Sequence, residues 1–156
     1  TKLGDVSEAG MALRDMMSEL LAIEPVNRRL SERISALDVA YSAGKAAETH
    51  PWVGRRAPDR ALVTDRGAAR LYELLHAARF VLLDLAGAAD LREAGAAWSD
   101  RADVVRATAA PGSDLAALDA VLVRPDGHVA WATDGGRRAT RLADLRSALE
   151  SWCGPA

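Results

Sequence analysis

The residue types that most often carry catalysis are sparse in this chain. Cys153 is the single cysteine, and one thiol excludes a disulfide framework, a Cys-x-x-Cys redox pair and a thiolate zinc cage. His50, His76 and His128 lack the spacing of metal ligands, so we expect surface or turn histidines. We find no nucleophile-elbow serine, no glycine-rich phosphate loop and no convincing carboxylate pair. The sequence therefore predicts no catalytic, cofactor-binding or metal-binding residue.

One group of side chains suits molecular recognition. Trp52 precedes Arg55 and Arg56 in a stretch without regular periodicity. An indole beside two guanidinium groups is typical of an interface, because arginine can bind a carboxylate through two parallel hydrogen bonds. A surface loop without a partner is the alternative. Met16 and Met17 form a second candidate on a helical apolar stripe, where packing is favoured over an adaptable binding groove.

The charge balance argues against several classes of partner. Twenty Lys and Arg residues accompany twenty-two Asp and Glu residues, so no basic field for nucleic acid exists. No apolar run approaches the about 20 residues that span a bilayer, and no secretion leader is evident. From these features and the cysteine count we expect a cytoplasmic protein that binds neither nucleic acid nor a membrane.

The elements that must position these residues begin with two helices. Residues 7–23 carry an apolar stripe with Ser7 as N-cap, and Pro25 opens a second helix. We expect a short strand at 37–41 and a linker loop over 42–60, which is broken by glycine and proline. The stripe comprises Leu13, Met16, Met17, Leu20 and Leu21.

The rest of the chain alternates between strands and helices. A helix capped by Thr64 or Asp65 is predicted over 67–77, and a capping box of Asp90 and Glu93 opens another. A terminal helix capped by Thr140 would stop at Gly154. The remaining predicted elements are strands at 61–63, 79–85 and 103–107, a helix at 90–98 and a helical turn at 114–118.

Residues 120–133 form the centre of this pattern, as a hairpin closed by Arg124-Pro125-Asp126-Gly127. Pro125 presets φ in the turn, and Gly127 can adopt the positive φ that closes it. The first arm is apolar on both faces, which predicts a strand covered on both sides. In the second arm, Val129 and Trp131 alternate with His128 and Ala130. Here we expect Trp131 to be buried and truncation of His128 to be nearly silent.

Crossover helices imply parallel pairing and the hairpin adds antiparallel strands, so the expected fold is an α/β mixed sheet flanked by helices. The element order matches the thioredoxin fold. The thioredoxin cysteines would fall at residues 86–89, where this chain has no thiol, so disulfide exchange is chemically impossible. The position of the thioredoxin cis-proline corresponds to Asp119 here. We therefore expect a thioredoxin-like scaffold without redox chemistry.

Four ordered motifs resemble the C-terminal region of bacterial FAD-dependent aromatic hydroxylases. The resemblance is to the group that acts on aromatic polyketides, related to para-hydroxybenzoate and phenol hydroxylases. Two earlier stretches, Val26–Leu30 and Ile34–Tyr41, resemble the segment that joins the flavin domain to its thioredoxin-like tail. The motifs are Pro51–Asp59, Arg70–Leu75, Arg79–Leu83 and Val123–Trp131.

The resemblance implies that NAD(P)H reduces FAD in the full-length enzyme, which then inserts one oxygen atom from O₂ into an aromatic ring. The flavin-binding motifs of such enzymes are missing here, so no cofactor is expected on this chain. The implied role is a non-catalytic module that packs on the flavin domain of the same polypeptide and stabilises it or its oligomer, such as a homodimer. The alternative is a free-standing, redox-inactive, thioredoxin-like binding protein. The expected division is an arm over 1–41 (the end of the flavin-domain region), a linker over 42–60 and a thioredoxin-like domain over 61–156.

Overall fold

The computed structural model describes residues 4, 6–35, 39, 41, 50–137 and 139–156. The chain divides into two compact units, Thr1–Val39 and Ala40–Ala156, and each is described by itself. No helix among the described residues is long and apolar enough to cross a bilayer.

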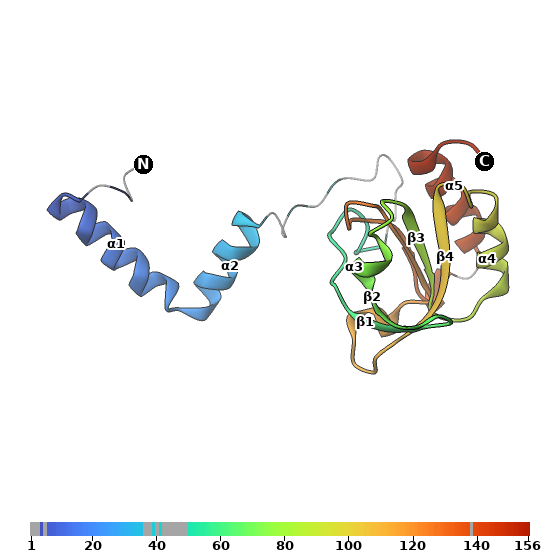
Figure 1. The fold of residues 1–156 in the computed structure, drawn as a ribbon, viewed down its shortest axis with the longest axis horizontal. Helices are drawn as coiled ribbons and strands as arrows, with labels where there is room; N and C mark the ends of the chain where they lie inside the picture. Colours follow the sequence, from blue (N-terminus) through green and yellow to red (C-terminus); the bar gives the residue numbers. More distant parts are fainter. Residues whose placement is uncertain (1–3, 5, 36–38, 40, 42–49, 138) are drawn as a thin grey trace. The chain divides into compact units, whose positions relative to one another are not determined.

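The first unit contains two helices, α1 (Glu8–Leu21) and α2 (Glu24–Ile34), as the sequence predicted (Figure 1). The Ser7 hydroxyl accepts a hydrogen bond from the Gly10 amide and so caps α1. Pro25 lies in the first turn of α2, where its missing N–H has no cost.

The apolar stripe of α1 is largely uncovered within this unit. Met16 is 51% exposed and Leu20 is 39% exposed, whereas Met17 is half-buried. Since α2 contains no buried residue, this helix pair forms no core of its own. The strand expected at 37–41 falls mostly outside the described residues.

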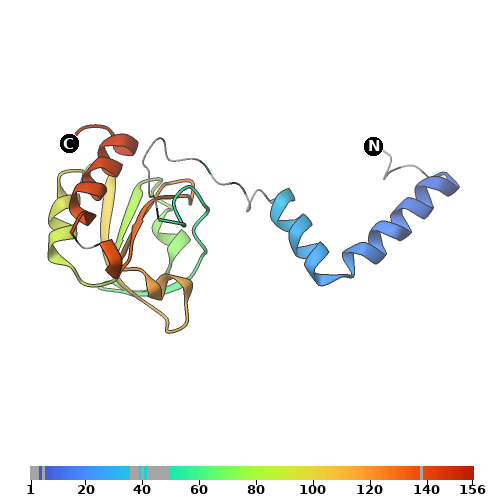
Figure 2. The same cartoon turned by 180° about the vertical axis from the view of Figure 1, so that it is seen from behind.

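The second unit is built on a six-stranded mixed sheet in the order β2-β1-β4-β3-β5-β6 (Figures 1 and 2). The parallel pair β3 and β4 is joined by α4, and the other neighbouring strands run antiparallel. The strands are β1 (Ala61–Thr64), β2 (Gly67–Arg70), β3 (Phe80–Asp84), β4 (Ala102–Ala109), β5 (Ala120–Val123) and β6 (Val129–Thr133). The helices are α3 (Leu71–Leu74), α4 (Ala89–Ala96) and α5 (Arg141–Cys153), with 3₁₀ turns η2 (Asp114–Ala117) and η3 (Gly135–Arg137).

The two faces of the sheet are covered in different ways. Figure 1 shows α4 and α5 together on one face, where they pack on Leu82, Leu122 and Trp131. The other face is covered by α3, by η2 and by the irregular segment 50–59. Every residue of β5 is buried, which confirms that this strand is covered on both sides.

The predicted hairpin is present, but its second arm does not alternate simply. The register shifts between Leu122 and Val123, so β6 carries one extra residue in a bulge. As a result Val129 packs in one core and Trp131 in the other. Gly127 has φ +83° and Trp131 is 7% exposed, as expected.

Two local predictions were wrong. Residues 67–70 form β2 instead of a helix, because the Thr64 hydroxyl accepts the Arg66 amide and donates to the Gly67 carbonyl, which closes a β-turn. As a consequence β1 pairs antiparallel with β2; on its other side β1 pairs antiparallel with β4.

The predicted capping box is also absent, since α4 begins at Ala89 and the carboxylate that receives the Ala88 amide belongs to Asp84. Thr140 does precede α5, yet its hydroxyl bonds to Asp144 rather than to a backbone amide.

Candidate functional site

Three segments that are far apart in sequence meet beside the hairpin turn. Residues 54–57 run along the start of β6 and are held by three backbone hydrogen bonds. The Gly54 amide donates to the Val129 carbonyl, the Val129 amide to the Arg55 carbonyl, and the Ala57 amide to the Gly127 carbonyl, each at 2.8 Å. The stretch predicted as a loop is therefore irregular but firmly attached.

The third segment, around α3, is hydrogen-bonded to residues 57–59. The Tyr72 hydroxyl donates to the Ala57 carbonyl at 2.9 Å. Asp59 accepts hydrogen bonds from the Arg70 guanidinium and the Tyr72 amide. Partial burial alone would raise the pKa of Asp59, but these bonds and the nearby positive charge outweigh it and hold that pKa below its ordinary value.

The turn itself is stabilised by charges and rings. Arg124 pairs with Asp126 and lies over the Trp152 ring at 4.3 Å and the Tyr41 ring at 5.5 Å. Asp126 also accepts the His128 amide. Burial raises the pKa of Asp126, but this hydrogen bond and the Arg124 charge outweigh it, so the pKa lies below its ordinary value.

His128 corrects the expectation of a surface histidine, because it is only 5% exposed. The Tyr41 ring meets the imidazole edge-on, with 4.8 Å between centroids. Nδ1 lies 3.3 Å from Asp126 Oδ1, but the alignment is too poor for a hydrogen bond, and Nε2 has no partner among the described residues. The ring acts as packing material here.

Trp52, Arg55 and Arg56, the predicted interface residues, lie together on this attached segment. Trp52 is half-buried against the core, Arg55 is exposed and Arg56 is half-buried. Arg56 pairs with His128 as an isolated antiparallel bridge. Met16 and Met17 belong to the other unit, on α1.

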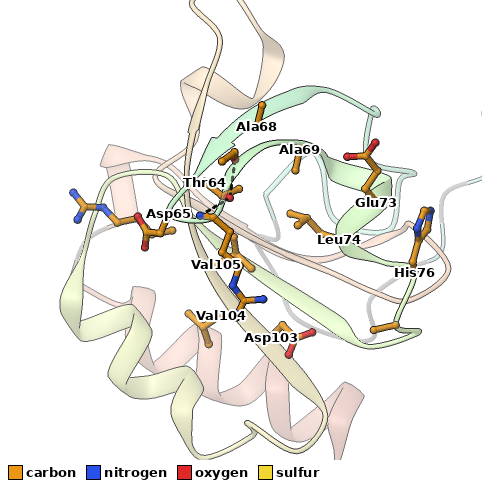
Figure 3. Close-up of a pocket in the computed structure, with 14 residues that line it drawn as sticks. Thr64, Asp65, Ala68, Ala69, Glu73, Leu74, His76, Asp103, Val104 and Val105 are labelled. Atoms are coloured by element: carbon orange, nitrogen blue, oxygen red, sulfur yellow. Dashed lines mark hydrogen bonds between the residues drawn. The ribbon is translucent and has the colours of Figure 1, made fainter.

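A separate open pocket of about 620 Å³ lies between the β1–β2 turn, α3 and β4 (Figure 3). Two of its carboxylates are already engaged: Glu73 accepts the Arg70 amide, and Asp103 pairs with Arg79 at 3.0 Å. His76 lies at its rim and is exposed. No three metal-ligating side chains gather anywhere among the described residues.

The junction of β3 and α4 is the place where a dinucleotide pyrophosphate would rest on a helix N-terminus. The fully buried Asp84 carboxylate occupies it, accepting the Ala88 amide at 2.8 Å and pairing with Arg92 at 2.6 Å. A buried carboxylate repels a phosphate, so these residues do not fit a dinucleotide cofactor. Cys153 is half-buried at the end of α5, and burial raises the pKa of its thiol, which disfavours a reactive thiolate.

Sequence reasoning missed Tyr41 and Tyr72, which fasten the hairpin turn from distant segments. Each lies in a stretch that had been assigned to an ordinary strand or helix. The sequence did carry a signal for them, because both tyrosines belong to stretches that resemble aromatic hydroxylases.

A family model described as "Aromatic-ring hydroxylase, C-terminal" matches residues 50–156. Over 145 residues the chain is 46% identical to the 12-dehydrotetracycline 5-monooxygenase/anhydrotetracycline 6-monooxygenase of Streptomyces rimosus, an alignment that covers 92% of this chain and 28% of that enzyme. The chain thus spans little more than a quarter of the length of this relative.

Two solved structures resemble the fold at similar identity. OxyS anhydrotetracycline hydroxylase from Streptomyces rimosus aligns with a TM-score of 0.74 at 45% identity, covering 92% of this chain and 29% of that one. CabE, an aromatic hydroxylase from angucycline biosynthesis, aligns with a TM-score of 0.74 at 44% identity, covering 96% and 30%.

Proposed function

The chain belongs to the family of aromatic-ring hydroxylase C-terminal domains, as its motifs indicated, and from this membership we propose that it is the non-catalytic C-terminal module of an FAD- and NAD(P)H-dependent aromatic-ring monooxygenase. In this proposal it packs on the flavin domain of the same polypeptide and stabilises that domain or its oligomer. The location of such an enzyme would be the cytoplasm.

The observation that carries the proposal is the convergence of three of the four family motifs on a structural cluster. Residues 54–59, Tyr72 and the turn at 124–128 hold one another through backbone and charged hydrogen bonds. A reacting centre would instead combine a nucleophile or base with an open pocket. The motifs are explained by the need to present the surface around Trp52, Arg55 and Arg56 in a fixed shape.

The finer parts of the proposal concern fold and boundaries. The parallel β3–α4–β4 unit beside the β5–β6 hairpin, with helices on both faces, supports a thioredoxin-like scaffold. The uncovered stripe with Met16 and Met17 supports assigning residues 1–41 to the end of the flavin-domain region, ahead of a linker at 42–60 and the domain at 61–156. This stripe would contact the flavin domain or a second copy.

The test compares three proteins. They are this chain, the whole polypeptide encoded by the reading frame that contains it, and a truncated form of that polypeptide that ends before residue 50 and so lacks the domain. We expect the chain to be colourless and to show no FAD or NADPH binding by calorimetry. We expect the whole polypeptide to retain FAD and the cut form to lose it at a lower temperature. Micromolar FAD binding by the chain alone, or equal flavin retention by the whole and cut forms, would contradict the proposal.

The rival proposal is a free-standing, redox-inactive, thioredoxin-like binding protein. The same reading frame discriminates between the two, because a start codon directly before this chain supports the rival and an upstream FAD fingerprint supports the hydroxylase module. Light scattering on this chain and on a version that starts at His50 tests whether the helical arm drives dimerisation.

A further inference from the structure

The arginines of residues 50–156 differ sharply in how they are paired. Seven of them each have a carboxylate partner within 4.0 Å: Arg60, Arg70, Arg79, Arg92, Arg101, Arg124 and Arg141. Arg55 and Arg56 are adjacent, yet neither forms an ion pair with a described residue. Other arginines of this unit without an ion pair to a described residue, such as Arg66, Arg106 and Arg146, are exposed, whereas Arg56 is half-buried on the segment that the family motifs hold in place.

Arg56 is the better placed of the two to grip a partner. Its Nε is buried and has no hydrogen-bond partner among the described residues, while the residue as a whole is half-buried and so keeps part of its surface in contact with solvent. A guanidinium whose Nε is covered and whose terminal nitrogens reach solvent can bind one carboxylate, to which those nitrogens donate two parallel hydrogen bonds. The exposed Arg55 lacks this covering.

The backbone beneath Arg56 is fixed before any partner arrives. Hydrogen bonds on both sides hold it, from the Val129 amide to the Arg55 carbonyl and from the Ala57 amide to the Gly127 carbonyl. In the bridge with His128 the two side chains are cross-strand neighbours. Little backbone entropy therefore remains to be lost on binding, although the Arg56 side chain still has to be ordered.

No carboxylate of a described residue forms an ion pair with Arg56. The nearest acid on the hairpin, Asp126, is engaged by Arg124 and by the His128 amide. Asp59, two residues past Ala57, is engaged by Arg70 and the Tyr72 amide. Trp52, on the same segment, is half-buried against the core.

We propose that Arg56 is the anchor of the domain interface and binds the carboxylate of an aspartate or glutamate on the flavin portion of the same polypeptide. This inference rests on the proposed function and adds the chemistry of the contact. Arg55 serves at the rim and steers the approach through its charge.

The experiment measures amide hydrogen exchange of residues 50–57 by mass spectrometry in the whole flavin-loaded polypeptide and in this chain alone. In the wild type we expect slower exchange in the whole polypeptide. Arg56→Gln should speed that exchange about 10- to 100-fold, which is the loss expected for a hydrogen-bonded charged pair. Arg56→Lys should lose much of the protection too, because an ammonium group does not form the two-pronged contact.

The matched control is Arg146→Gln, an exposed arginine on α5 without an ion pair to a described residue; it should leave the exchange unchanged. If Arg56→Gln speeds exchange equally in the chain alone, Arg56 has a role within the domain and the inference is wrong. Binding of inorganic phosphate to the wild-type chain, lost in Arg56→Gln, would assign the site to a phosphate and also overturn it. If removing the domain weakens flavin retention while Arg56→Gln leaves the exchange of residues 50–57 unchanged, the proposed function stands and the assignment of Arg56 as the anchor is wrong.

Discussion

The two faces of the central sheet reach the same degree of burial by different means. On one face, α4 and α5 supply an apolar stripe to Leu82, Leu122 and Trp131. On the other face, α3 is only four residues long, and much of the cover is the irregular segment 50–59. Yet Leu71, Val81 and Leu83 on that face are fully buried.

The difference lies in how the covering backbone satisfies its polar groups. A helix does so internally, so only its apolar face has to match the sheet. The backbone of the irregular cover instead forms hydrogen bonds with groups outside it or with side chains, such as the β6 backbone, the Tyr72 hydroxyl and the Asp59 carboxylate. The helical face therefore depends on apolar volume, whereas the irregular face depends on a few specific hydrogen bonds and close approaches.

The largest expected effect tests whether both cores are packed equally well. Trp131→Ala on the helical face should lower the free energy of unfolding by about 3–5 kcal/mol, and Leu71→Ala on the irregular face by about 2–5 kcal/mol. Urea denaturation of both variants measures these losses. A loss below about 1 kcal/mol for Leu71→Ala would show that the irregular face is loosely packed and would break the comparison.

The second prediction concerns a close approach on the irregular face. Gly54 has φ +83°, and a Cβ there would lie 1.9 Å from the carbonyl oxygen of Tyr41. The Tyr41 amide donates a hydrogen bond to the Gly54 carbonyl, which keeps the two backbones close together. Gly54→Ala should cost about 2 kcal/mol or more, since both strain and a backbone clash arise. Gly127→Ala is the matched control, because the atoms nearest to its Cβ would belong to the Tyr72 side chain, at 3.1 Å; its cost should be about 1 kcal/mol. Equal losses in urea would contradict the ranking.

The third prediction uses acid to weaken the irregular face. Because the folded state holds the pKa of Asp59 below its ordinary value, the carboxylate stabilises the fold above about pH 4, and this contribution is lost as the pH falls through the lowered pKa. Asp59→Asn should cost about 1 kcal/mol at pH 7, since the pair with Arg70 is partly exposed and screened. The gap between variant and wild type should close toward pH 2. If the free energies of unfolding of wild type and Asp59→Asn differ by the same amount from pH 7 to pH 2, this prediction is wrong.

The smallest effect is expected at His128. Its ring nitrogens form no hydrogen bond with a described residue, so His128→Phe removes only the 3.3 Å approach of Nδ1 to Asp126 and keeps most of the volume. The free energy of unfolding should change by about 1 kcal/mol or less. His128→Ala is the control and should cost more, contrary to the silent truncation expected from sequence, because it empties a buried site. A large loss for His128→Phe would show that the imidazole nitrogens serve the irregular face.

The helical face could be predicted from the sequence almost completely. The stripe of Leu142, Leu145 and Leu149 and the hairpin arms gave the right elements because apolar periodicity reports burial directly. The irregular face could not be predicted in this way. In the sequence, Thr64 resembles the N-cap of a helix, whereas in the structure its hydroxyl closes a β-turn. At the candidate interface, residue types alone singled out Trp52, Arg55 and Arg56. The attachment of Arg56 beside the buried His128 depends on pairing between distant segments, which periodicity does not report.

The strand order also has a consequence for the time course of folding. Each edge of the sheet is a hairpin, β1–β2 and β5–β6, whose strands are adjacent in the chain, while the central pair β3–β4 needs a crossover and β1 pairs with β4 across a long separation. Local pairs close quickly and distant pairs slowly, because loop closure precedes their contacts. We expect the two hairpins to form early and independently, and β3 and β4 to join them in the rate-limiting step. Substitutions at Leu82 and Val104 should then slow folding more than substitutions in β2, whose exposed residues change the rate little.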